Sequence, residues 1–207
     1  TMPPTPPPEI SLKVFELGGN QLATEVFEGS SVMAEITFSG GALPPGMAVT
    51  VTADTNFDGE IQGGDMSPES RVLRNPGLGT RFYYIFSLPD DGPWPGNGTP
   101  SDKLTIRATY GTQVKTYELT VVNVPPRITA PPSFSLVTDS SGAPVARVTV
   151  AVADVGIHDN HVATVKWSDG QIYTTRSYGN YDNPCGPVAS RSVIVNRMLA
   201  AGESVYP

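Results

Sequence analysis

Residues 32–38 read Val-Met-Ala-Glu-Ile-Thr-Phe, and every second side chain in this stretch is apolar. Successive side chains of a β-strand point to opposite faces, so the alternation predicts a strand with one buried face. The same period of two returns in short runs bounded by Gly, Pro or Asn, at residues 10–14, 49–53, 82–86, 104–108 and 117–121. No convincing amphipathic helix separates these runs, so the sequence predicts an all-β fold of the antiparallel sandwich type.

A proline-containing junction, Val122-Asn123-Val124-Pro125-Pro126, ends the last of these runs. Proline has no amide hydrogen to donate to a sheet, so strand pairing is expected to stop here. The strand pattern then begins again, with apolar residues at Phe134, Leu136, Val145, Val148, Val150, Val152, Val162, Val165, Val193 and Val195. We therefore expect two tandem Ig-like β-sandwiches, over residues 10–124 and 125–207, after a proline-rich linker at residues 1–9.

The composition argues against two classes of partner. The chain has 13 Lys and Arg against 20 Asp and Glu, a formal charge of −7 over 207 residues, and its basic residues form no stripe. Nucleic-acid binding needs clustered basic residues, and no apolar run approaches the roughly 18 residues of a membrane span. Cys185 is the single cysteine, so no disulfide can form within the chain, and outside the cell such a chain needs another source of rigidity.

The twelve residues from Asp54 to Asp65 read Asp-Thr-Asn-Phe-Asp-Gly-Glu-Ile-Gln-Gly-Gly-Asp. Oxygen-bearing side chains stand at positions one, three, five and twelve, and the glycine at position six allows a sharp turn. Calcium takes roughly six to eight oxygen ligands at about 2.3–2.6 Å, and short calcium loops use this spacing. The ligands we expect are the side chains of Asp54, Asn56 and Asp58, the backbone carbonyl of Glu60, a water-mediated contact from Gln62 and a closing carboxylate from Asp65.

The last position of this loop departs from the usual pattern, because Asp replaces Glu and is short enough to close the shell with one oxygen instead of two. In this respect the loop resembles the calcium loops of dockerin repeats. The alternative interpretation is a solvated turn, since Asp, Asn and Gly also favour Asx-turns and left-handed backbone. Because the loop follows the strand pattern at residues 49–53 and not a helix, we expect Ca²⁺ to stiffen an inter-strand loop.

The second half of the chain carries Asp-Val-Gly-Ile-His-Asp-Asn-His-Val-Ala-Thr-Val-Lys-Trp-Ser-Asp-Gly over residues 154–170. Its end resembles the Trp-Gly-Asp-Gly hallmark of the PKD (polycystic kidney disease) family of Ig-like domains. Trp167, Asp169 and Gly170 match this hallmark, and Ser168 replaces its first glycine. The further positions that look like this family are Asp154, Gly156, Asp159, His161 and the junction at residues 122–126.

This resemblance covers residues from about 122 to 207 and extends less well to the first half. It implies non-catalytic modules of bacterial cell-surface or secreted proteins. Residues 201–207 resemble the approach to the family's final strand, so we expect the second sandwich to lack that strand. Two explanations stay open: the chain is a fragment of a longer polypeptide, or another chain completes the domain.

Two histidines, His158 and His161, flank Asp159 and Asn160. They could belong to a zinc or copper site, which would need further converging ligands, or they could make structural hydrogen bonds. No Gly-x-Ser-x-Gly elbow and no acid/base pair emerges from the spacing, so we do not expect an enzyme.

Three functions follow from these patterns. The leading hypothesis is a structural or adhesive module, extracellular or at the cell surface, with Ca²⁺ bound in its first domain. The second is an ancillary carbohydrate-binding module of a secreted enzyme, with an aromatic platform formed by Trp94, Tyr173, Tyr178 and Tyr181. The third is a subunit of an extracellular filament that exchanges strands. The expected partners are therefore calcium, other surface-protein subunits or glycans.

Overall fold

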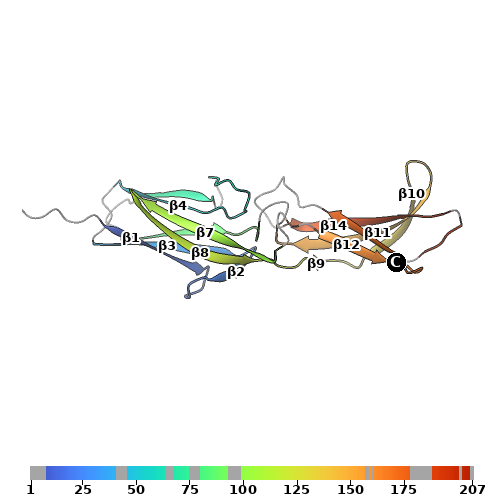
Figure 1. Ribbon diagram of the computed structural model, residues 1–207, viewed down its shortest axis with the longest axis horizontal. Coiled ribbons are helices and arrows are strands. Elements are labelled where there is room, and N and C mark those ends of the chain that lie inside the picture. Colours follow the sequence, from blue (N-terminus) through green and yellow to red (C-terminus); the bar gives the residue numbers. More distant parts are fainter. Residues whose placement is uncertain are drawn as a thin grey trace, which may run out of the picture. The chain divides into compact units, whose positions relative to one another are not determined.

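The computed structural model describes residues 8–40, 46–63, 68–74, 80–92, 99–156, 159, 161–177, 188–200 and 202–205. This part of the chain consists of strands, turns and loops without a helix, so the all-β prediction is confirmed for it. Accordingly, no helix long and apolar enough to cross a membrane occurs in these ranges. The chain divides into two compact units, Thr1–Asn123 and Val124–Pro207, coloured blue to green and yellow to red in Figure 1.

Unit 1 contains two sheets. The first has the strand order β1-β3-β6, with β1 at Glu9–Glu16, β3 at Ser31–Ser39 and β6 at Arg81–Ser87. The second has the order β2-β8-β7-β4-β5, with β2 at Glu25–Phe27, β8 at Gln113–Val122, β7 at Ser101–Tyr110, β4 at Ala48–Thr52 and β5 at Ser70–Arg74. The short β2 runs parallel to β8, and the other neighbouring strands are antiparallel.

The core of unit 1 lies between these two sheets. In β3 the apolar positions of the alternating sequence are the buried ones, while the intervening side chains are only partly covered. The core receives Val14 and Phe86 from the first sheet and Val51, Ile106 and Val121 from the second, all of them fully buried. Two sheets that share one apolar interior in this way are compatible with a β-sandwich.

Unit 2 also contains two sheets. The larger has the order β10-β11-β14, with β9 paired to β11, and the smaller consists of β12 and β13. The strand bounds are Arg127–Ile128 for β9, Ser133–Thr138 for β10, Pro144–Asp154 for β11, His161–Lys166 for β12, Ile172–Ser177 for β13 and Val188–Met198 for β14. The core of this unit is formed by Ala146, Val148, Val165, Trp167, Val195, Leu199 and Val205.

Two strands lie in stretches where the sequence shows no run of alternating apolar residues. One is β5, at Ser70–Arg74, which pairs with β4. The segment around Tyr173 reads as part of an aromatic platform, yet it is β13, which pairs with β12. β5 is an edge strand with every residue exposed or only half-buried, so its sequence has no reason to alternate and carries no period-two signal.

Candidate metal site

The candidate calcium loop connects β4 to β5 as a long hairpin connection in unit 1. Asp54 is the second residue after β4, and Glu69 stands immediately before β5. The amide of Ala53 donates to the carbonyl of Glu69 at 2.9 Å, and the amide of Ser70 donates to the carbonyl of Gln62 at 3.1 Å. The β4–β5 ladder therefore brings Glu69 back beside the start of the loop, although many residues of sequence separate the two.

The first half of the loop winds around the carboxylate of Asp54. Its Oδ1 accepts a hydrogen bond from the amide of Asp58 at 3.1 Å, and its Oδ2 accepts one from the amide of Gly59 at 2.9 Å. Gly59 has φ of 85°, and the non-glycine Phe57 has φ of 54°, so both lie in the left-handed region. Glycine adopts this region without the steric cost that a side chain adds, which explains the requirement for Gly59.

Glu69 anchors the other side of the loop through a nearly buried carboxylate, 6% exposed. Its Oε1 accepts from the amide and the hydroxyl of Thr55, at 2.6 and 3.0 Å, and from the amide of Asn56 at 3.1 Å. Its Oε2 accepts from the amide of Gln62 at 3.1 Å. Hydrogen bonds to a charged acceptor are stronger than neutral ones, so this carboxylate holds both ends of the loop together.

Three carboxylates converge at this point. Asp54, Asp58 and Glu69 each offer an oxygen within 4.8 Å of the other two. Around them, Asp58 Oδ2 accepts from the side-chain amides of Asn56 and Gln62, both at 3.0 Å, and Asp58 Oδ1 accepts from the amide of Glu60 at 2.8 Å. Such a group of hard oxygen atoms on a tightly turned loop has the ligand chemistry that Ca²⁺ prefers.

The electrostatics of the loop also favour a cation. Burial raises the pKa of the Asp54 carboxyl above its ordinary value of 3.8, and the negative charge of Asp58 raises the pKa further. The hydrogen bonds that Asp54 accepts from the backbone oppose this effect. The folded loop thus holds Asp54 in a position where its negative charge is disfavoured, and a bound cation would relieve that cost.

Tyr84, on the other sheet of unit 1, contacts the end of the loop next to Glu69. The hydroxyl of Tyr84, on β6, donates a short hydrogen bond to the carbonyl of Pro68, next to Glu69. Burial raises the pKa of this hydroxyl above its ordinary value of 10.0, which keeps the proton in place for donation. The ring of Tyr84 packs edge-on against Phe86 in the core, with 4.7 Å between centroids.

The structure brings most of the predicted ligand residues together and places beside them a carboxylate that the sequence did not indicate. Asp54, Asn56 and Asp58 lie in the carboxylate group or contact it directly, whereas Glu60 contributes a backbone amide contact to Asp58. Asp65 lies outside the described residues. Glu69 was missed because it lies beyond the twelve-residue pattern; the only signal for it would have been the pairing of β5 with β4.

A second group of carboxylates lies elsewhere in unit 1. Glu28 follows β2, and Asp90 and Asp91 follow β6. All three residues are buried, with exposures of 3%, 1% and 5%, and their oxygens lie within 4.8 Å of one another. Like-charged groups this close repel unless a cation or hydrogen-bond donors offset their charge.

In unit 2 the described histidine makes a structural contact. Nε2 of His161, the first residue of β12, lies 2.7 Å from Oδ2 of Asp154, the last residue of β11. Asp154 Oδ1 accepts from the amide of Val155 at 2.8 Å. Both side chains are buried, and Nδ1 of His161 has no hydrogen-bond partner within the part of the chain that the structure describes. His158 and Asn160 lie outside the described residues.

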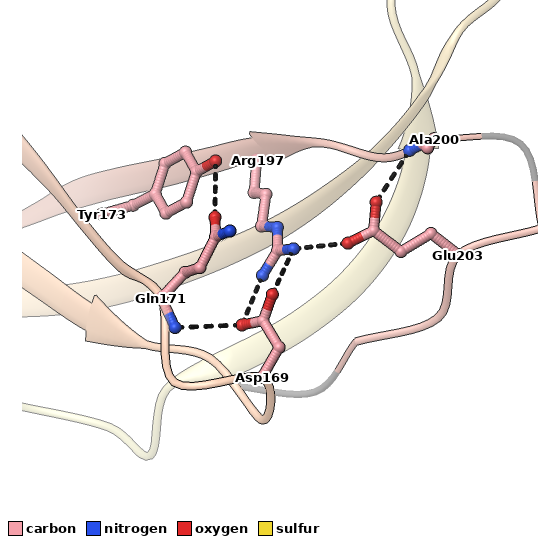
Figure 2. Close-up of polar contacts among 6 residues, drawn as sticks. All are labelled: Asp169, Gln171, Tyr173, Arg197, Ala200 and Glu203. Carbon is pink, nitrogen blue, oxygen red and sulfur yellow. Dashed lines mark hydrogen bonds and ion pairs between the residues drawn. The ribbon is translucent and has the colours of Figure 1, made fainter.

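Figure 2 shows the polar cluster built on the Trp-Ser-Asp-Gly turn between β12 and β13. Arg197, on β14, is 4% exposed and makes a bidentate contact with Asp169, with Nη1–Oδ1 at 2.9 Å and Nη2–Oδ2 at 2.6 Å. The same guanidinium binds Glu203, whose other oxygen accepts from the amide of Ala200 at 2.8 Å. The turn, β14 and the following segment are thus joined through one arginine.

Aromatic rings complete the surroundings of this arginine. Its guanidinium carbon lies 5.8 Å from the ring centroid of Trp167 and 5.6 Å from that of Tyr173. The hydrogen bonds from Arg197 hold the pKa of the Asp169 carboxyl below its ordinary value of 3.8. Tyr173 is partly buried against the core of unit 2. Trp94, Tyr178 and Tyr181 lie outside the described residues, so the aromatic platform stays a prediction.

Comparison with family models and with curated protein sequences gave no match to this chain.

Proposed function

We propose that this chain is a non-catalytic structural or adhesive module of a bacterial surface protein, and that Ca²⁺ stiffens its first domain. The observation that carries the proposal is the convergence of Asp54, Asp58 and Glu69 on a loop that their own hydrogen bonds hold in shape. Extracellular calcium modules typically bind with dissociation constants of about 10⁻⁴–10⁻³ M, which suits a site with three carboxylates and a preformed loop.

The strand order of unit 1 supports an Ig-like assignment. One sheet carries β3 and β6, and the facing sheet carries β4, β7 and β8 with β5 at its edge. When β1 and β3 to β8 are counted as the seven main strands, the second and fifth oppose the third, sixth and seventh, as in an Ig-like sandwich. The fourth, β5, departs from the seven-strand pattern, because it pairs with the third strand. For unit 2, the anchoring of Asp169 by Arg197 gives the PKD-like turn a structural role, which supports a spacer or adhesive domain.

A catalytic role has little support in the described residues. The His161–Asp154 pair has the chemistry of a catalytic dyad, but both side chains are buried, so a substrate could not reach the imidazole. The carboxylates of the metal site are engaged by backbone amides of their own loop, an arrangement that holds the loop in shape.

The test is a calcium titration of the chelator-treated protein by calorimetry, with thermal unfolding in parallel. We expect saturable binding and a rise in melting temperature; at a free concentration of 100 times Kd, one site stabilises the folded state by about 2.7 kcal/mol. The variant Asp58→Ala should lose both effects, whereas the exposed side chain of Glu60 can be changed to Gln without loss. No heat and no change in melting temperature at millimolar Ca²⁺ would rule out the metal site.

A further inference from the structure

The smaller sheet of unit 2 has an edge that no described strand covers. In the β12–β13 hairpin the amide of Trp167 donates to the carbonyl of Gln171 at 2.8 Å, and Gly170, with φ of 84°, closes the turn. Hydrogen-bonded pairs alternate along an antiparallel ladder, so residues at odd positions of β12 direct their backbone groups to β13. The backbone groups of Val162, Thr164 and Lys166 therefore point to the opposite edge, and β13 is the one partner of β12 among the described strands.

The larger sheet of unit 2 leaves part of its core-facing side uncovered. In one row across this sheet, Leu136 of β10 lies opposite Ala146 of β11, which lies opposite Arg197 of β14. Ala146 is 0% and Arg197 is 4% exposed, but Leu136, on the same face, is 65% exposed. In the next row Val148 is buried at 3%, while its neighbour Phe134 is 36% exposed. In these two rows the side chains of β14 and β11 are therefore buried, and those of β10 are more exposed.

Contacts between the two sheets of unit 2 relate the open edge of β12 to the exposed side chain of Leu136. β14 packs against both β12 and β13, and Tyr173 of β13 lies beside Arg197 of β14. Trp167, directly after β12, reaches further across: it contacts Arg197 and also meets the ring of Phe134 on β10, with 6.4 Å between centroids. These contacts are consistent with the order β13 then β12 in the direction from β14 to β10, an order that would place a strand added beside β12 over Leu136.

We infer that the free edge of β12 binds an extended segment of a partner protein, which adds to the β12–β13 sheet as a third strand. The backbone groups of Val162, Thr164 and Lys166 supply the hydrogen bonds of this added strand. Alternate side chains of the segment face inward onto Leu136 and Phe134, so they are apolar. The intervening side chains face solvent beside Lys166, the one strongly basic residue of β12, so an acidic residue fits there.

The surface available favours an extended segment over the face of a second folded copy. Leu136 is 65% and Phe134 is 36% exposed, so together they expose about as much surface as one whole large side chain. That is on the order of 200 Å² of apolar surface. A stable complex of folded partners buries about 800 Å² on each side. Main-chain hydrogen bonds make up this difference for a strand, and the net charge of −7 disfavours pairing of two copies.

Two proline variants of matched position test the inference. Thr164 and Thr174 lie opposite each other, and their hydroxyls are 3.2 Å apart, so either substitution removes the same side-chain contact. Thr164→Pro removes an amide from the free edge of β12. Thr174→Pro removes an amide from the outer edge of β13. Neither amide is used between the two strands, so both variants are expected to fold.

The probe is a fluorescein-labelled, acetylated heptapeptide, Thr-Val-Thr-Val-Glu-Val-Thr, and binding to the full chain is measured by fluorescence anisotropy. We expect saturation at or below about 1 mM peptide, with affinity reduced at least about tenfold by Thr164→Pro and unchanged within about twofold by Thr174→Pro. Leu136→Asp, at an exposed position, should weaken binding to a similar extent. Binding should persist in chelator, because the site lies in unit 2 and is independent of the proposed calcium function.

Several outcomes would overturn the inference. One is that the protein binds neither the peptide nor versions of the peptide with Glu at position one or three, at about 1 mM peptide. Another is equal binding by the wild-type chain, Thr164→Pro and Leu136→Asp. If both proline variants lose binding, the peptide affinity of Leu136→Ser is measured instead, because this change leaves the hairpin backbone intact. Unchanged affinity in that variant refutes the site. Self-association in sedimentation that Thr164→Pro abolishes would assign the edge to a second copy of the chain instead.

Discussion

Replacing Glu69 tests whether one carboxylate both anchors the β4–β5 loop and closes the metal site. Glu69 accepts hydrogen bonds from the amides of Thr55, Asn56 and Gln62, and Thr55 and Asn56 are only 4% and 7% exposed. In Glu69→Ala these two buried amides lose their acceptor. A buried donor without a partner costs about 1–3 kcal/mol, so we expect the free energy of unfolding of unit 1 to fall by roughly 2–4 kcal/mol.

Glu69→Gln separates charge from shape. Its carbonyl oxygen can still accept from Thr55 and Asn56, but its amide group would face the amide of Gln62, where two donors meet. We expect a smaller loss of about 1–2 kcal/mol, because one hydrogen bond and the charge assistance of the others disappear. Glu60→Gln is the control, since this exposed side chain lies on the same loop and should change stability by less than about 0.5 kcal/mol.

The assay is guanidinium unfolding with and without saturating Ca²⁺, together with hydrogen exchange at the amides of Thr55 and Asn56. Both Glu69 variants should exchange these amides faster and lose at least about tenfold in calcium affinity. A Glu69→Ala protein as stable as the wild type would refute the anchoring role. Unchanged calcium affinity in Glu69→Gln, with loss in Asp65→Asn, would support the predicted role of Asp65 as the closing ligand.

Three further predictions follow from individual contacts. Because the pKa of Asp54 is raised in the folded state, the stability of the calcium-free protein should fall as pH rises from about 4 through that raised pKa. Asp54→Asn or saturating Ca²⁺ should remove this pH dependence in thermal melts. A wild-type pH profile that neither change alters would contradict the prediction. The pKa of Asp169 is lowered in the folded state, so its contribution to the stability of unit 2 is complete above pH 3.8 and is lost as pH falls below that value. Near-ultraviolet circular dichroism should show this loss of structure at acid pH in the wild type and not in Asp169→Asn. Phe86→Ala, at a fully buried position, should lower the free energy of unfolding by about 3–5 kcal/mol in denaturant unfolding. Ile85→Ala, at the neighbouring position that is 41% exposed, should lower it far less. Similar losses in the two variants would argue against the core assignment.

The extent to which the fold follows from the sequence depends on how much each strand buries. β3 and β7 each turn one face into the core, so their apolar residues alternate and the strands are visible in the sequence. β5 lies at a sheet edge and β13 in a two-stranded sheet, where fewer side chains are buried, and both were missed. Burial on one face produces the period of two, so a strand without a buried face leaves little trace in the sequence.

The candidate metal site likewise has one part that the sequence indicates and another that depends on strand pairing. Asp54, Asn56, Asp58 and Gly59 act within a single turn of chain, so their spacing alone indicates the ligand geometry. Glu69 enters the site through the pairing of β5 with β4, a contact between distant segments that no local pattern carries. Local spacing therefore suggested the type of site that we propose, and strand pairing supplied its anchoring carboxylate.

The sequence by itself determined the all-β class, most of the buried strands and the acidic turn after β4, because each depends on residues a few positions apart. The tertiary structure alone decided which strands are neighbours, that Arg197 joins the Asp169 turn to β14, and that Leu136 on β10 stays exposed. These features depend on pairing between distant segments, and the alternation of side chains along one strand does not specify which other strand it meets.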